Sequence, residues 1–152
     1  MARRFGTFTV PAQTTSTGTK TQLQIRASAN AAVAITRLFV GGHGISNTNE
    51  PIRVDLVRQS DAGTGMGSTP VGNKLDTGIT HTFQTTAAAT EATVEPTTTD
   101  VIKSFTFHPQ TGLDVAFGRE DEVIIPVSGR VGVRTLQAGT APKLDITVDF
   151  EE

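Results

Sequence analysis

Cysteine, tyrosine and tryptophan are all absent from the 152 residues of this chain. Without cysteine, disulfide bonds and thiolate chemistry are excluded. Without Tyr and Trp, the usual aromatic platforms for sugars and single-stranded nucleic acids are missing, and eight Phe residues supply all the aromatic rings apart from histidine. The composition therefore argues against a carbohydrate-binding module and against a protein that binds single-stranded nucleic acid.

Charge is sparse and nearly balanced. Fifteen Asp and Glu residues against thirteen Lys and Arg give a formal net charge of -2, and charged residues make up only 18% of the chain. A nucleic acid or an anionic membrane would require a basic surface, and the only basic cluster is Arg3-Arg4. This low fraction of charged residues suggests that part of the surface is formed by loops or is covered by a partner.

Long apolar segments are also missing. No run approaches the roughly 20 residues that span a bilayer, and the first five residues do not form the apolar region of a signal peptide. We therefore expect no membrane partner and synthesis in a cytoplasm.

Alternation of apolar and polar residues is the strongest pattern in the sequence. Between residues 144 and 150, Leu, Ile, Val and Phe alternate with Asp and Thr. A period of two is typical of an antiparallel strand with one buried face. Alternating runs also occur at 8–10, 23–25, 52–57, 105–107 and 131–133, a longer apolar run occurs at 33–40, and a continuous one occurs at 123–127. Pro126 predicts an edge or a bend in the run at 123–127.

The pattern predicts an all-β protein: one antiparallel jelly-roll or β-sandwich domain of about eight strands over residues 1–152, with a short N-terminal arm at 1–5. No stretch shows a convincing helical period, and the Ala-rich residues 87–92 could form one helical turn but are favoured as loop. Two long loops are expected at 59–73 and 85–100, and loops of this length often carry function.

Two short motifs resemble catalytic or binding sites. Residues 63–68 resemble a phosphate-binding glycine loop, but Pro70 and Val71 follow where such a loop needs a helix. Asp76, in the sequence Leu-Asp-Thr-Gly, resembles half of a dimeric aspartic protease. The residues before it lack the apolar strand of such an enzyme, so a turn is the favoured interpretation.

Metal and nucleophile signatures are weak. His43, His81 and His108 are far apart in the sequence, although folding could still bring three histidines together. The acidic residues at 120–122 and 151–152 lack the spacing of a known calcium loop, and no serine lies in a nucleophile elbow. We expect no cofactor and no enzymatic activity.

Four segments resemble the jelly-roll decoration, or auxiliary head, proteins of tailed bacteriophages. They are the opening strand at 8–12, a strand running into a Gly/Ser loop at 52–71, the Leu-Asp-Thr-Gly turn at 75–78, and the last third at 122–152. The chain departs from this family at 117–120, where Phe-Gly-Arg-Glu stands in place of a segment that often carries Trp.

The resemblance implies a virion structural protein that binds the outside of an assembled head, contacts the major capsid protein and forms a homotrimer. The alternatives are a ligand- or host-surface-binding β-sandwich module, of the head-fibre or carbohydrate-binding type, and, less favoured, a dimeric aspartic protease using Asp76. The N-terminal arm offers Arg3, Arg4 and Phe5 as anchors, expected to become ordered only in the interface. The other expected interface residues are Met66 in the glycine-rich loop, and Glu151 and Glu152 as acceptors at the C-terminal end.

Overall fold

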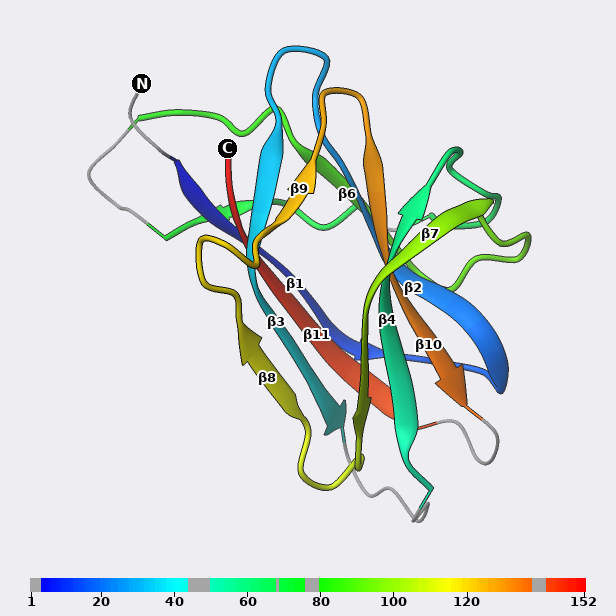
Figure 1. The fold of residues 1–152 in the computed structure, drawn as a ribbon. Coiled ribbons are helices and arrows are strands. Elements are labelled where there is room, and N and C mark those ends of the chain that lie inside the picture. The colour runs from blue at the N-terminus through cyan, green and yellow to red at the C-terminus, as the bar shows by residue number, and fades with distance from the viewer. Residues whose placement is uncertain (1–3, 44–49, 68, 76–79, 138–141) are drawn as a thin grey trace.

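The computed structural model describes residues 4–43, 50–67, 69–75, 80–137 and 142–152 (Figure 1). Every element assigned in these ranges is a strand, and the strands form two antiparallel sheets. The first sheet runs in the order β5 (Asn73–Lys74), β1 (Phe5–Gln13), β11 (Lys143–Glu151), β3 (Val33–His43) and β8 (Leu113–Ala116), and β9 (Val123–Ile125) pairs with β3 next to β8. The second runs β6 (Thr86–Ala89), β2 (Gly18–Arg26), β10 (Arg130–Gln137), β4 (Ile52–Gln59) and β7 (Thr98–Phe107).

The connectivity is that of a jelly roll. The chain passes from one sheet to the other at every connection between consecutive strands except β6 to β7 and β8 to β9. β8 and β9 pair with successive parts of β3 and can be counted as one interrupted strand. Apart from the short strands β5 and β6, each sheet then has four strands, which is the double-sheet arrangement of a jelly roll. The predicted all-β jelly-roll sandwich is therefore confirmed, and all eight predicted strands are present.

The inner faces of the two sheets form the core. Along β11, Leu144, Ile146, Val148 and Phe150 are fully buried and alternate with half-buried Asp and Thr residues, as the sequence predicts. From the facing sheet come side chains such as Leu23, which is also fully buried. Burial of each such side chain stabilises the fold by about 1.5–3 kcal/mol.

Three strands, β5, β6 and β8, were not predicted. The expected loop at 85–100 is wrong in part, because Thr86–Ala89 forms β6 and pairs with β2, and Thr98 already belongs to β7. The expected loop at 59–73 begins and ends in strands, β4 and β5, and its Thr64 pairs with Val94 of the other segment. The segment that follows β4 and the segment that precedes β7 are thus paired with each other at Thr64 and Val94.

The run at 123–127 behaves as Pro126 predicts. β9 ends at Ile125, the residue before the proline, and pairs with β3 alone. The chain then turns, with the amide of Gly129 donating to the carbonyl oxygen of Pro126, before β10 begins.

Gly132 permits a close crossing on the outer face of the second sheet. The side chain of Gln59 lies over this glycine, so that a Cβ atom there would be 2.6 Å from Gln59 Oε1. From this position Gln59 donates to Thr21 Oγ1 over 2.9 Å and accepts from Gln24 Nε2 over 2.7 Å. The absence of a side chain at residue 132 is therefore what lets β4 and β2 be tied together across β10.

We predict that Gly132→Ala lowers the free energy of unfolding by about 1–3 kcal/mol, because the new methyl group collides with the buried Gln59 amide. Chemical denaturation measures the loss. Gly118→Ala is the matched control, since a Cβ atom at Gly118 meets no heavy atom within 4 Å. An equal effect of the two substitutions would contradict the crossing described here.

Candidate functional site

The two ends of the described chain are hydrogen-bonded to each other. The amide of Arg4 donates to the carbonyl oxygen of Glu152 over 3.1 Å, and the amide of Glu152 donates back to Arg4 over 2.9 Å. Phe5 is the first residue of β1 and lies opposite Glu151. The expectation of a free arm at 1–5 is therefore wrong for Arg4 and Phe5, which continue the first sheet, while Arg3 lies outside the described residues.

Glu152 has a structural role that its position as a chain end did not suggest. Its carboxylate accepts hydrogen bonds from the amides of Gln84 and Thr85 and from the Thr85 hydroxyl, the last two over 2.8 and 2.6 Å. These bonds fix the segment that leads into β6. The Glu152 carboxylate, which we expected to accept hydrogen bonds from a partner, thus already accepts them from residues 84 and 85 of the same chain.

Exposed apolar side chains surround the start of β1. Phe5 is 41% exposed, and its carbonyl oxygen accepts a hydrogen bond from the amide of Leu75, which is 56% exposed. Met66 is not part of this cluster: it is half-buried in the segment where Thr64 pairs with Val94. The structure therefore brings Arg4, Phe5 and the C-terminal glutamates together and leaves Met66 apart.

A line of rings leads from the core to the surface. Phe8 stacks on Phe150 with 4.7 Å between ring centroids, Phe83 meets Phe150 edge-on at 4.9 Å, and His81 meets Phe83 edge-on at 4.7 Å. Gly6 allows this packing, because a Cβ atom there would lie 2.6 Å from the rings of Phe150 and Phe83. The outer rings of the line, Phe83 and His81, reach a groove.

We call this groove the Phe83 groove. Its volume is about 370 Å³, and it lies between residues 69–74 and 81–86. Apolar side chains supply much of its lining, including Phe83 and the highly exposed Val71. Both ring nitrogens of His81 are shielded from solvent and have no hydrogen-bond partner. The groove is thus largely apolar, with a polar ring that makes no hydrogen bond.

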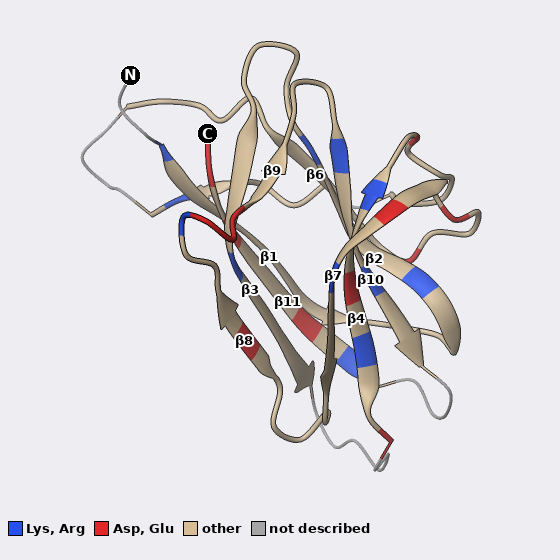
Figure 2. Cartoon of the chain, viewed as in Figure 1, with Lys and Arg blue, Asp and Glu red and all other residues tan. Residues whose placement is uncertain are grey.

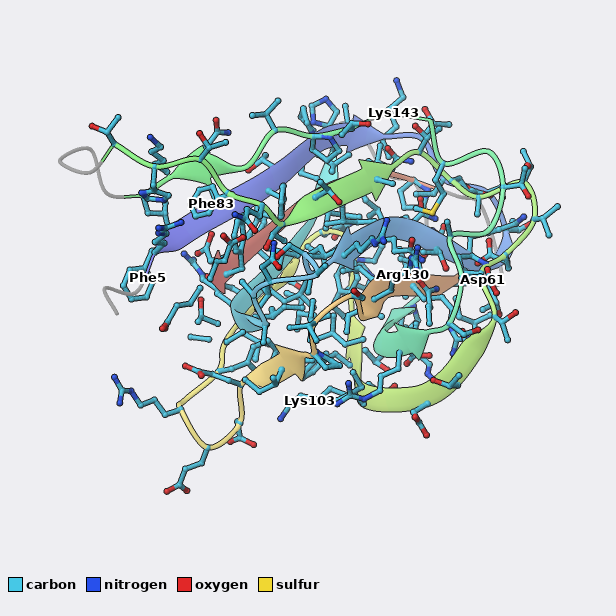
Figure 3. The ribbon with its side chains drawn as sticks, turned by 90° about the horizontal axis from the view of Figure 1, so that it is seen from above. Phe5, Asp61, Phe83, Lys103, Arg130 and Lys143 are labelled. Atoms are coloured by element: carbon cyan, nitrogen blue, oxygen red, sulfur yellow. The ribbon has the colours of Figure 1, made fainter. Side chains whose placement is uncertain are left out.

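A second, smaller hollow adjoins the first. It has a volume of about 220 Å³, shares Thr69 and Thr86 with the Phe83 groove, and is lined by Gln24, Arg26 and Arg130 among others. The shared residues show that the two hollows adjoin. Figure 3 labels Phe83 and Arg130, which mark the apolar and the basic part of this surface.

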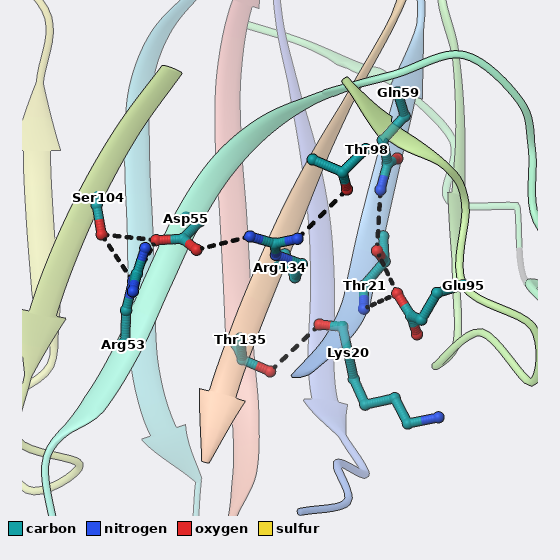
Figure 4. Close-up of polar contacts among 10 residues, drawn as sticks. All are labelled: Lys20, Thr21, Arg53, Asp55, Gln59, Glu95, Thr98, Ser104, Arg134 and Thr135. Atoms are coloured by element: carbon teal, nitrogen blue, oxygen red, sulfur yellow. Dashed lines mark hydrogen bonds and ion pairs between the residues drawn. The ribbon is translucent and has the colours of Figure 1, made fainter. Parts of the chain in front are cut away.

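A buried polar network lies on the outer face of the second sheet (Figure 4). At its centre Asp55 is only 3% exposed and accepts from Arg53 over 2.8 Å, Arg134 over 3.0 Å and Ser104 over 2.6 Å. Arg134 also donates to Thr98 over 3.3 Å. The network ties β4 to its two neighbours, β10 and β7.

Burial by itself would raise the pKa of Asp55, because a carboxylate loses hydration inside the protein. The hydrogen bonds from Ser104, Arg53 and Arg134 and the positive charge of Arg53 outweigh that effect. The pKa of Asp55 is therefore below its ordinary value of 3.8, and the carboxylate is ionised at neutral pH. Its surroundings stabilise a fixed charge, which is the opposite of what a general acid near neutral pH needs.

The same face holds the covering segments in place. Glu95 accepts from both the amide and the hydroxyl of Thr21, over 2.9 and 2.7 Å. Gln24 donates to the carbonyl oxygen of Asp61 over 2.9 Å. The chain around Asp61 and the chain around Glu95 are thus attached to β2 by hydrogen bonds, and they cover the sheet instead of extending into solvent.

The first two amides of the glycine-rich motif are hydrogen-bonded within the chain, and Ser68 at its end lies outside the described residues. Gly63 donates its amide to Asp61 Oδ1 over 2.8 Å, and Thr64 donates to the carbonyl oxygen of Val94 over 2.9 Å. Gly63 and Gly65 adopt positive φ angles of 61° and 84°, so the motif forms a tight turn against residues 93–96. Asp76, the other motif residue, lies outside the described residues.

The three histidines are in different surroundings. His43 Nδ1 lies 3.2 Å from Asp145, His81 packs on Phe83, and His108 Nδ1 accepts from the amide of Gln110. In the part of the chain that the structure describes, no three His, Asp or Glu side chains gather as metal ligands. That part also contains no helix with the length and apolarity to cross a membrane.

Comparison of the chain with protein-family models, with curated proteins and with solved structures gives no match. Functional inference therefore depends on the residues and surfaces described above.

We predict that Asp55→Asn lowers the free energy of unfolding at neutral pH by about 3 kcal/mol, because Arg134 and Arg53 lose their shared counter-charge. The folded pKa of Asp55 is below its unfolded value, so its contribution is complete above about pH 3.8 and is lost as the pH falls through the folded pKa. Melting temperatures measured from pH 7 to pH 2 should fall less steeply below about pH 3.8 in the variant than in the wild type. Parallel curves would show that the carboxylate makes no such contribution.

We also predict that Glu152→Ala lowers the free energy of unfolding by about 1–2 kcal/mol and speeds amide exchange at Thr85, because both backbone donors lose a charged acceptor. Glu120→Ala removes the same charge from an exposed turn and should have little effect. If Glu152→Ala left both stability and exchange unchanged, the carboxylate would be free to serve a partner.

Proposed function

We propose that this chain is a non-catalytic virion structural protein that binds the outside of an assembled bacteriophage head and stabilises it. Its partners are the major capsid protein and two further copies of itself in a homotrimer. It is made in the bacterial cytoplasm and resides on the exterior of the capsid. No nucleic acid, membrane or cofactor takes part in this function.

The observation that carries the proposal is the strand order of the two sheets. The sequence resemblance to decoration proteins implies a jelly roll, and the orders β1-β11-β3-β8/β9 and β2-β10-β4-β7 have that connectivity. One fold hosts many functions, so the surfaces of this chain also bear on its function. The buried carboxylate of Asp55 on the outer face is held ionised in a structural network, and the Phe83 groove has an apolar lining suited to a protein segment.

The physical advantage of such a protein is additive binding. A small domain that touches several shell subunits at once raises the effective concentration of each contact, so weak contacts combine into a stable one. A trimer with closed cyclic symmetry matches the three-fold positions of an icosahedral lattice.

We predict that the purified protein co-sediments with assembled empty heads that lack it, saturates at a fixed ratio to the major capsid protein, and raises the temperature at which the heads rupture. Unassembled capsid protein is the control and should bind far more weakly, because only the shell presents several contacts together. Absence of binding to heads, at protein concentrations above 10 µM or so, would contradict the proposal, since multivalent contacts should be much tighter than that.

A surface-binding module, such as a head fibre that attaches to a host or to a small ligand, is the second candidate. The Phe83 groove favours it, because a partly apolar hollow of about 370 Å³ is within the usual size of ligand sites. The co-sedimentation experiment separates the two, since such a module need not stabilise the shell against rupture.

A further inference from the structure

Two arginines lie directly opposite each other at one end of the second sheet. Arg26 ends β2 and Arg130 begins β10, and the two are paired in the register. Figure 2 colours all Lys and Arg positions blue, those of β2 and β10 among them, and Figure 3 labels Arg130. Residues paired in this way project from the same face, and like charges there repel and destabilise the sheet. Because the repulsion between the two arginines destabilises the sheet, we looked for an anion that the pair could bind.

No acidic side chain relieves the repulsion within the described residues. Neither arginine makes an ion pair or a side-chain hydrogen bond there, in contrast to Arg37, Arg53 and Arg134, which all contact aspartates. Asp61, whose carbonyl oxygen is held by the neighbouring Gln24, directs its carboxylate to the amides of Gly63 and Thr97. The two guanidinium groups are therefore available to an outside anion.

The arginines line the smaller hollow, which adjoins the Phe83 groove through Thr69 and Thr86. On one side of these shared residues the surface offers two guanidinium groups, and on the other it offers Val71 and the ring of Phe83. A free inorganic anion would use only the first part. An extended protein segment with a carboxylate and a nearby apolar side chain would use both.

We propose that Arg26 and Arg130 form a carboxylate-binding site, and that the adjoining hollows hold an extended acidic and apolar segment of a partner protein. The guanidinium fork matches the two oxygens of a carboxylate, and binding would cancel the repulsion between the arginines. The proposal rests on the proposed function and deepens it, because it assigns the surface through which the shell is bound. A protein segment is favoured over a nucleic acid because the chain has a net charge of -2 and the adjoining hollow is apolar.

The first experiment is independent of capsids. The double variant Arg26→Gln/Arg130→Gln should melt at the same temperature as the wild type or about 1–3 °C higher, since repulsion is removed. Addition of 50 mM succinate, compared with sodium chloride of equal ionic strength, should raise the melting temperature of the wild type by about 2 °C or more and that of the double variant much less. Arg119→Gln removes the same charge from an exposed turn and should respond as the wild type does.

The second experiment measures co-sedimentation with empty heads. The double variant should bind at least tenfold more weakly, and Arg119→Gln should bind normally. Val71→Ser should also weaken binding without loss of stability, because Val71 is 77% exposed and lies in the Phe83 groove. Val94→Ser is the control for an exposed valine that does not line either hollow. Arg130→Lys, which keeps the charge but loses the fork, should give an intermediate loss.

The outcomes are separable. If wild type and double variant bind heads equally, this inference is wrong and the proposed function stands. If the wild type binds no heads, the proposed function is wrong, and the succinate experiment decides the site: an equal response in wild type and double variant overturns it. If inorganic phosphate stabilises only the wild type while succinate has no effect, the site takes phosphate, and the carboxylate proposal is also overturned.

Discussion

The rest of the structure depends on the burial of two apolar sheet faces against each other. In β11 this constraint fixes every second side chain, since Ile146 and Val148 must point inward and Thr147 must point outward. Because side chains alternate across a strand, the same constraint in β2 and β10 decides what the outer face of the second sheet presents. Arg26 and Arg130 project outward because Ile25 and Val131, their chain neighbours, are in the core.

The outer face of the second sheet is sealed mostly by polar contacts. Gln59 crosses over Gly132 to reach β2, and Asp55 joins the strands on either side of β4. Hydrogen bonds in such a network fix direction as well as distance, so they hold the covering segments in one arrangement. One of these segments contributes Thr69, which lines both hollows. Gln24 belongs to both, because it donates to Gln59 and to Asp61 in the network and also lines the smaller hollow.

The eight core strands could be predicted from the sequence because six contain the alternation that burial of one face demands, and the runs at 33–40 and 123–127 are rich in β-branched apolar residues. The strand at 86–89 could not, because Thr-Ala-Ala-Ala has neither alternation nor β-branched apolar residues, and it forms through pairing with β2. The opposition of Arg26 and Arg130 depends on a register that shifts at Val133, which no local pattern reveals. The terminal residues were misjudged because the bonds between Arg4 and Glu152 join the two ends of the chain.

The central claim is that this jelly roll binds a shell through the surface that contains Arg26 and Arg130. The most direct test is an image reconstruction of empty heads saturated with the protein, at a resolution that orients the two sheets. The account predicts density for the sandwich on the outer surface, with the ends of β2 and β10 and the Phe83 groove against a capsid subunit. A bound domain whose groove faces open solvent would contradict it.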